Sequence, residues 1–135
     1  MRKSIKGILI DPFSKTVTEV TVTGEPSSWG SDYDYLESFY NFLDCTVVQP
    51  ATLDIVGESL YVDEEGLIRE KRQMFFYLPN ISPYQPLAGK GIFVGFSDDG
   101  KYKDTALTVE DIQKQIEWMS PIQALAKSKQ IEASL

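Results

Sequence analysis

With 135 residues, of which 42% are hydrophobic and 24% charged, the chain has the length and composition of a single globular domain with one buried core. Its formal net charge of −7 disfavours general binding of DNA or RNA, because an acidic surface repels the phosphate backbone. The sequence has no histidine, which excludes a Ser-His-Asp triad, a Cys-His dyad and any histidine-containing metal site.

The cysteine content and the apolar runs indicate a compartment. A lone cysteine, Cys45, excludes an internal disulfide framework, fits a reducing cytosol and is typical of a small buried hydrophobic residue. Residues 1–11 are too poor in apolar side chains for a signal peptide, and no run approaches the roughly 18 apolar residues of a membrane helix. We expect a cytoplasmic protein without membrane association.

The first third of the chain predicts a β-hairpin and then a helix. Two strands, residues 6–10 and 16–23, flank the turn DPFSK, and the second strand is rich in β-branched residues. A polar loop over residues 24–32 follows. Apolar side chains then recur at helical spacing, which predicts a helix from about Asp32 to Leu43.

The middle of the chain predicts further strands and turns. Strand-like pieces cover residues 45–50, 52–57 and 59–62, and the turn DEEG leads into a return strand. The apolar run MFFYLPN precedes a proline-rich segment, residues 81–86, that we expect to be a rigid loop. Residues 92–96 predict a buried strand.

The C-terminal part predicts two helices. Thr108 with Asp111 at the third helical position resembles a capping box, and the apolar stripe of that helix reaches Met119. Pro121 suits the first position of a last helix over residues 121–130. The sum is an α+β domain, residues 1–130, in which an antiparallel sheet carries one helix after the first hairpin and two C-terminal helices; residues 131–135 form a flexible tail.

The segment LAGKGIFVGFSDDG, residues 87–100, does not match a phosphate-binding loop. No Ser or Thr follows the Gly-Lys pair, Val94 stands where a Rossmann fingerprint needs its third glycine, and a turn follows in place of a helix. A strand whose glycines allow close backbone approach fits better. The acidic turns 63–65 and 98–99 lack the spacing of an EF-hand and are typical of solvated turns.

One basic stretch stands out in this acidic chain. Arg69, Lys71 and Arg72 precede three aromatic residues, and arginine forks bind phosphates while aromatic faces stack on bases. A solvated hairpin arm explains the same charges. Together with other cationic, aromatic and polar residues, this stretch gives the set that we expect to contact an anionic ligand: Trp29, Arg69, Lys71, Arg72, Tyr77, Asn80, Tyr84 and Lys90.

Several pieces of the chain together resemble a small family of domains of unknown function that is common in bacteriophages and plasmids. They are the segments ILIDP, YLESFYNFL, LYVDEEGLI, YLPN, LAGKGIFVGFSDDG and LTVEDIQKQIEWM, and the resemblance covers roughly residues 5–119. It implies a phage or mobile-element protein made in the cytoplasm of a host bacterium. It implies no catalytic residues.

These observations lead to two expectations about function. In the first, the protein is no enzyme and needs no cofactor or metal. As a homo-oligomer, it binds and sequesters a nucleotide-derived immune signal, such as a cyclic nucleotide or a cyclic ADP-ribose variant, and this sequestration blocks anti-phage defence. In the second, it is an acidic inhibitor that binds a host protein directly. Catalysis by carboxylates, lysine or tyrosine stays open. The edge of strand 92–96 and residues 121–135 are the expected interfaces between copies.

Overall fold

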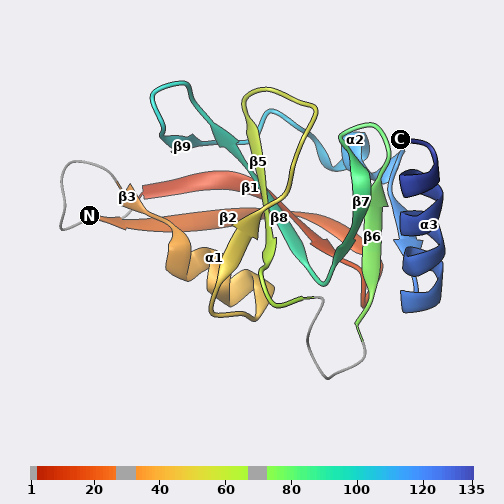
Figure 1. Cartoon of the computed structure of the whole chain (residues 1–135). Coiled ribbons are helices and arrows are strands. Elements are labelled where there is room, and N and C mark those ends of the chain that lie inside the picture. The colour runs from red at the N-terminus through yellow and green to blue at the C-terminus, as the bar shows by residue number, and fades with distance from the viewer. Residues whose placement is uncertain (1–2, 27–32, 67–72) are drawn as a thin grey trace.

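The computed structural model describes residues 3–26, 33–66 and 73–135, and it confirms the α+β class. The elements are β1 (Lys3–Asp11), β2 (Thr16–Pro26), β3 (Tyr33–Asp34), α1 (Leu36–Leu43), β4 (Val48–Pro50), β5 (Glu58–Asp63), β6 (Phe75–Leu78), β7 (Ser82–Ala88), β8 (Gly91–Phe96), β9 (Tyr102–Lys103), α2 (Val109–Gln113), β10 (Glu117–Met119) and α3 (Pro121–Ala133). Figure 1 shows their arrangement.

The larger sheet is antiparallel and has the strand order β3-β2-β1-β8-β5-β4, with β9 paired to β8. The predicted first hairpin is confirmed: β1 and β2 pair from Lys3↔Gly24 to Asp11↔Thr16 without a break. The predicted strand at residues 92–96 is also confirmed as β8. Because β8 pairs with β1 on one side and β5 on the other, the edge that we expected to serve as an interface is not available.

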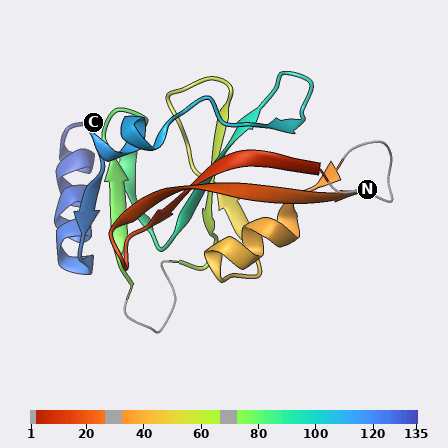
Figure 2. The same cartoon turned by 180° about the vertical axis from the view of Figure 1, so that it is seen from behind.

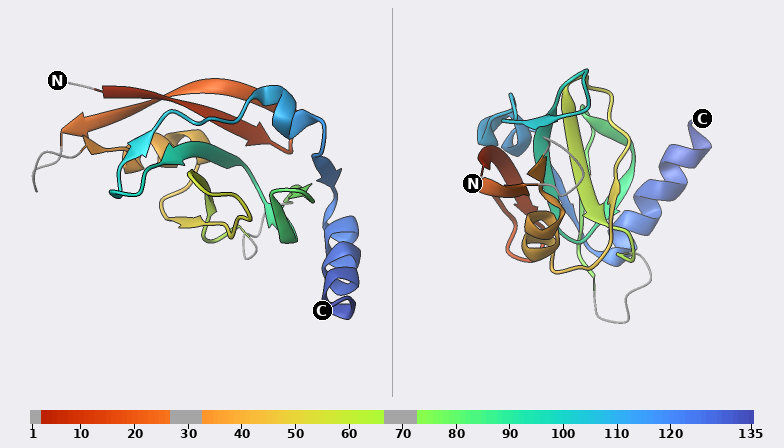
Figure 3. Two further views of the ribbon diagram at one scale, coloured as in Figure 1. Left: turned by 90° about the horizontal axis from the view of Figure 1, so that it is seen from above. Right: turned by 90° about the vertical axis from the view of Figure 1, so that its left-hand side faces the viewer.

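Helix α1 covers one face of the larger sheet, and the smaller sheet covers the other. Phe39 and Leu43 of α1 are buried against Val22, Ile92 and Val94. On the opposite face, the smaller sheet, of order β10-β6-β7, packs its side chains on the larger one; the core there includes Ile8, Ile10, Leu60, Phe76, Leu78, Phe93 and Ile112. Figures 2 and 3 show α1 lying along the β1–β2 hairpin, with α3 at the other end of the molecule against the smaller sheet.

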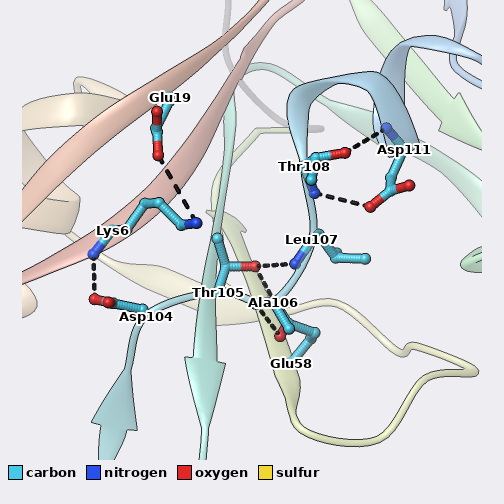
Figure 4. Close-up of polar contacts among 9 residues, drawn as sticks. All are labelled: Lys6, Glu19, Glu58, Asp104, Thr105, Ala106, Leu107, Thr108 and Asp111. Carbon is cyan, nitrogen blue, oxygen red and sulfur yellow. Dashed lines mark hydrogen bonds and ion pairs between the residues drawn. The ribbon is translucent and has the colours of Figure 1, made fainter.

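Polar contacts hold the connection between β9 and α2 against the larger sheet (Figure 4). The Glu58 carboxylate accepts hydrogen bonds from the Thr105 hydroxyl and from the Ala106 N–H, the latter at 3.0 Å. The predicted capping box is confirmed, since Thr108 and Asp111 exchange both of its hydrogen bonds. The short helix α2 is therefore defined at its start by its own sequence.

Several predicted elements differ from the structure. The helix expected from about Asp32 begins at Leu36, because Tyr33–Asp34 pairs as β3 with the end of β2. The helix expected to reach Met119 ends at Gln113, and Glu117–Met119 pairs as β10 with β6. Residues 81–86 were expected to form a loop, but most of them belong to edge strand β7, where prolines are tolerated because one side of the strand needs no N–H donors. No strand forms over residues 52–57. The last helix has Pro121 in its first turn, as predicted, and continues to Ala133.

The glycines of β8 permit close packing, as predicted. A Cβ atom added at Gly91 would lie 2.8 Å from Phe76 Cζ, and one at Gly95 would lie 2.3 Å from the Asp104 carbonyl oxygen. Side chains at either position would collide with neighbouring elements. Gly91 therefore allows the smaller sheet to pack closely on the larger one, and Gly95 allows the chain at and after β9 to approach β8.

Candidate functional site

A groove of about 600 Å³ lies between strand β2 and helix α1. One wall is strand β2 together with Asp34 of β3. The other wall is the exposed side of α1, which runs alongside β2 in Figure 2. The described residues that line it are Thr21, Thr23, Glu25, Asp34, Glu37, Ser38, Asn41 and Phe42. It is larger than the hollow of about 240 Å³ that lies between the β1–β2 hairpin and the start of α2.

The sequence of α1 places polar side chains in this groove. Phe39 and Leu43 point into the core, so the helix turns Glu37, Ser38 and Asn41 away from the sheet face and towards the groove. Asp34 precedes the helix, and its Oδ1 accepts the Leu36 N–H at 2.9 Å. This hydrogen bond gives a partner to one of the backbone N–H groups that have no acceptor within the helix at its N-terminus.

One contact fixes the spacing of the two walls. The Thr23 N–H of β2 donates to the Ser38 hydroxyl of α1 at 3.3 Å. Because this N–H points at the helix, it does not pair with β1, and the outer edge of β2 faces the groove. The groove therefore combines a strand edge with a helix surface.

The charges of the groove have one sign. Glu25, Asp34 and Glu37 contribute carboxylates, and none of the described lining residues is basic. Among the described residues, no group of three or more Asp, Glu or Cys side chains is arranged to hold a metal ion. Carboxylates spread along a groove suit a ligand with several positive charges, such as lysine and arginine side chains.

A second hollow, of about 240 Å³, lies between the β1–β2 hairpin and the start of α2. Its Lys6 and Glu19 side chains approach to 3.9 Å, as Figure 4 shows. The lining also includes Glu110, so this hollow carries charges of both signs, whereas the charged lining residues of the groove are all acidic in the described structure.

Half of the residues predicted to bind an anionic ligand lie outside the described part of the chain. These are Trp29, Arg69, Lys71 and Arg72. The prediction that they neutralise phosphates or stack on a base stays a prediction.

The two predicted residues of β6 and the turn that follows it already have partners within the chain. Tyr77 is buried, and its hydroxyl donates to the Pro83 carbonyl oxygen at 2.9 Å. Burial raises the pKa of Tyr77, with a smaller contribution from the charge of Glu117. The Asn80 N–H donates to Gln115 Oε1 at 3.0 Å, while the Asn80 side chain is exposed. Of the two side chains, only that of Asn80 faces solvent.

Tyr84 and Lys90 lie apart from each other. Tyr84 is 48% exposed as a residue, and its hydroxyl donates to the Asp54 carboxylate, a bond that raises the pKa of Tyr84. Lys90 follows the other end of β7, and its Nζ lies 3.0 Å from Asp44 Oδ2 at the end of α1. Tyr84 and Lys90 therefore pair with different acidic residues, and no hydrogen bond in the described structure joins Lys90 to Tyr84.

The acidic turns are largely solvated, as predicted. Glu64, Glu65, Asp98 and Asp99 are exposed. Asp63 differs, because it is buried and its Oδ1 accepts the Glu65 N–H at 2.9 Å. Cys45 is buried, as predicted for a small hydrophobic residue.

The sequence-based prediction did not include the groove residues. The available signal was the spacing of Asp34, Glu37, Ser38 and Asn41, which places polar side chains on one side of a helix whose other side is apolar. That spacing is common to solvated helices. The second wall, which turns the helix surface into a groove, comes from strand β2 and becomes visible only in the fold.

Comparison with known proteins identifies a family but no activity. The family described as "Domain of unknown function (DUF3846)" matches residues 5–120. No curated protein and no solved structure matches the chain significantly. In the described residues, no helix has the length and apolar character needed to cross a membrane.

Proposed function

The chain belongs to the DUF3846 family, and we propose that it acts by binding, without catalysis, as an acidic inhibitor that docks on a basic surface of another protein. The proposed setting is a bacterial cytoplasm, with the protein encoded by a phage or plasmid. The observation that carries the proposal is the groove between β2 and α1, whose charged lining residues are all acidic in the described structure.

The magnitudes favour a protein partner over a small molecule in this groove. An exposed ion pair contributes about 0.2–1 kcal/mol, so the groove carboxylates alone give weak attraction to a single small cation. A partner that places several lysine or arginine side chains in the groove forms several such ion pairs, whose free energies add, and it also gains apolar contact with Phe42. The net charge of −7 also speeds the encounter with a basic surface at low salt.

Site-specific photo-crosslinking in a bacterial host tests this proposal. A photoreactive amino acid replaces Asn41 in the groove, and a matched variant carries it at Gln130, an exposed position on α3. We expect Asn41 to crosslink to a protein with a basic surface in a salt-sensitive manner, and Gln130 not to do so. Equal labelling from both positions, or no labelling from Asn41, would contradict the proposal.

Sequestration of a nucleotide-derived signal is the second candidate. It is supported by the exposed Tyr84 ring and the exposed Asn80 side chain, which lie at the same end of the β6–β7 hairpin and offer a stacking surface and a polar group. Calorimetry with a panel of cyclic nucleotides and ADP-ribose derivatives tests it. Binding that weakens in a Tyr84→Ala variant supports this function, and the absence of heat with every compound rejects it for that panel.

A further inference from the structure

The outer edge of β2 is unpaired over most of its length in the described part of the chain. On that side, β2 pairs only through Glu25 and Pro26, which face β3. The opposite side of β2 pairs with β1 from Thr16 to Gly24. An open strand edge presents backbone N–H and C=O groups that can pair with another chain.

The register identifies which backbone groups point outward. Lys6 stands opposite Thr21, but its own N–H donates to Asp104 Oδ1 at 2.8 Å and its carbonyl accepts the Thr105 N–H at 2.9 Å. The Lys6–Thr21 pair is therefore not hydrogen-bonded, and the Thr21 N–H and C=O point to the outer edge. Thr23 has the same orientation, since its N–H reaches Ser38.

The outward groups of Thr21 meet the groove. Thr21 lines it and is exposed, and no described residue forms a hydrogen bond with its backbone. Helix α1 lies beside this edge and provides the floor beneath a strand added there. The side chains of an added strand alternate in direction, so every second one would point towards Glu37, Asn41 and Phe42 of α1.

We propose that the groove binds its partner by strand addition: an extended segment of the partner pairs with the outer edge of β2 at Thr21 and places basic side chains at alternate positions on α1. Backbone hydrogen bonds would supply affinity, and the acidic side chains would select lysine or arginine. This inference rests on the proposed function, because it specifies how the basic partner occupies the acidic groove.

Synthetic peptides test the inference without altering the protein. The probe is a fluorescent peptide of alternating lysine and threonine residues, and its binding is measured by anisotropy at low salt. Two further peptides of the same sequence carry N-methyl groups on either the lysine or the threonine residues. In an added strand only one of these sets of N–H groups faces β2, so we expect one methylated peptide to bind about tenfold or more weakly and the other to bind as the parent does.

A protein variant provides an independent check. Thr21→Pro removes an outward N–H and leaves the pairing with β1 intact, so the variant is expected to stay folded. Its affinity for the unmethylated parent peptide is expected to be about tenfold weaker. Thr21→Val keeps the N–H but also loses the hydroxyl, so we expect it to bind the peptide several-fold more tightly than Thr21→Pro, and the difference between the two variants reports the backbone donor. Circular dichroism confirms that both variants are folded before binding is compared.

The outcomes separate the two proposals. Equal affinity for both methylated peptides, or loss with both, overturns strand addition; if the parent peptide still binds in a salt-dependent manner, the proposed function stands. No binding of the parent peptide also overturns strand addition, and crosslinking from Asn41 then decides on the proposed function separately.

Discussion

Adding a single methyl group at Gly91 is expected to destabilise the protein, because the two sheets meet closely at this residue. The Cβ of an alanine would lie 2.8 Å from Phe76 Cζ and 3.1 Å from Leu60 Cδ1. Carbon atoms in contact prefer separations of about 3.5–4.0 Å, so the ring must retreat by about 0.7 Å or more. Phe76 is fully buried, and the dense packing of protein interiors leaves a buried ring little free space into which to move.

Two effects of Gly91→Ala oppose each other. Alanine restricts the unfolded chain and so stabilises the folded state by about 0.4–1 kcal/mol, and no positive φ at Gly91 cancels that gain. Overpacking a core costs about 1–3 kcal/mol. The steric cost is larger, and we expect a net loss of about 1–2 kcal/mol and a Tm lower by roughly 3–8 °C.

Urea unfolding followed by circular dichroism measures this loss, and a second substitution tests its cause. In a Phe76→Leu background, the atom that collides with the new methyl group is absent, so Gly91→Ala is expected to cost about 1 kcal/mol less than it does in the natural chain. An equal cost in both backgrounds would refute the packing argument. So would a Gly91→Ala variant as stable as the natural protein.

Two further predictions concern groups with shifted pKa values. Burial and a hydrogen bond to the Tyr61 hydroxyl raise the pKa of Tyr102. The contribution of the protonated Tyr102 to the free energy of unfolding is therefore complete below the unfolded pKa of about 10 and is lost as pH rises above it. In urea titrations, Tyr102→Phe is expected to lower stability at neutral pH and to make the loss of stability at alkaline pH smaller. The backbone hydrogen bond from Thr108 lowers the pKa of Asp111. The contribution of the Asp111 carboxylate to stability is therefore present above about pH 4 and is lost as pH falls. The Tm of Asp111→Ala is expected to fall less steeply with acid than that of the natural protein, and an equal fall would contradict the role of the capping box.

Local signals in the sequence predicted the elements that depend on neighbouring residues. The apolar run before the turn DPFSK and the β-branched run after it predicted the β1–β2 hairpin, and every residue pair of that hairpin lies within one short stretch of chain. The capping box of α2 and the proline at the start of α3 were equally local. These features required no knowledge of distant partners.

Elements that depend on distant pairing were mispredicted. Glu117–Met119 continues the helical spacing of the residues before it, yet it forms β10 because Phe75–Tyr77 offers a strand to pair with. Periodicity within the segment carries no information about that partner. The prolines of β7 suggested a loop for the same reason, since only the sheet order shows that this strand lies at an edge.

The candidate site was hidden by the same limitation. Lys90 attracted attention as an isolated cation, but its partner Asp44 stands 46 residues earlier in the chain. The polar side of α1 could be recognised in the sequence, whereas its position beside the open edge of β2 could not. A groove between two elements is a property of the fold.

The central claim is that the groove between β2 and α1 binds basic segments, and a charge-reversal comparison tests it most directly. Glu37→Lys reverses a charge in the groove, while Glu132→Lys makes the same change in net charge on exposed α3. Affinity for the lysine–threonine peptide is measured by anisotropy for both variants at equal salt. We expect Glu37→Lys to weaken binding about fivefold or more and Glu132→Lys to leave it nearly unchanged. Equal weakening by the two variants would show that only net charge matters and would contradict a binding site in the groove.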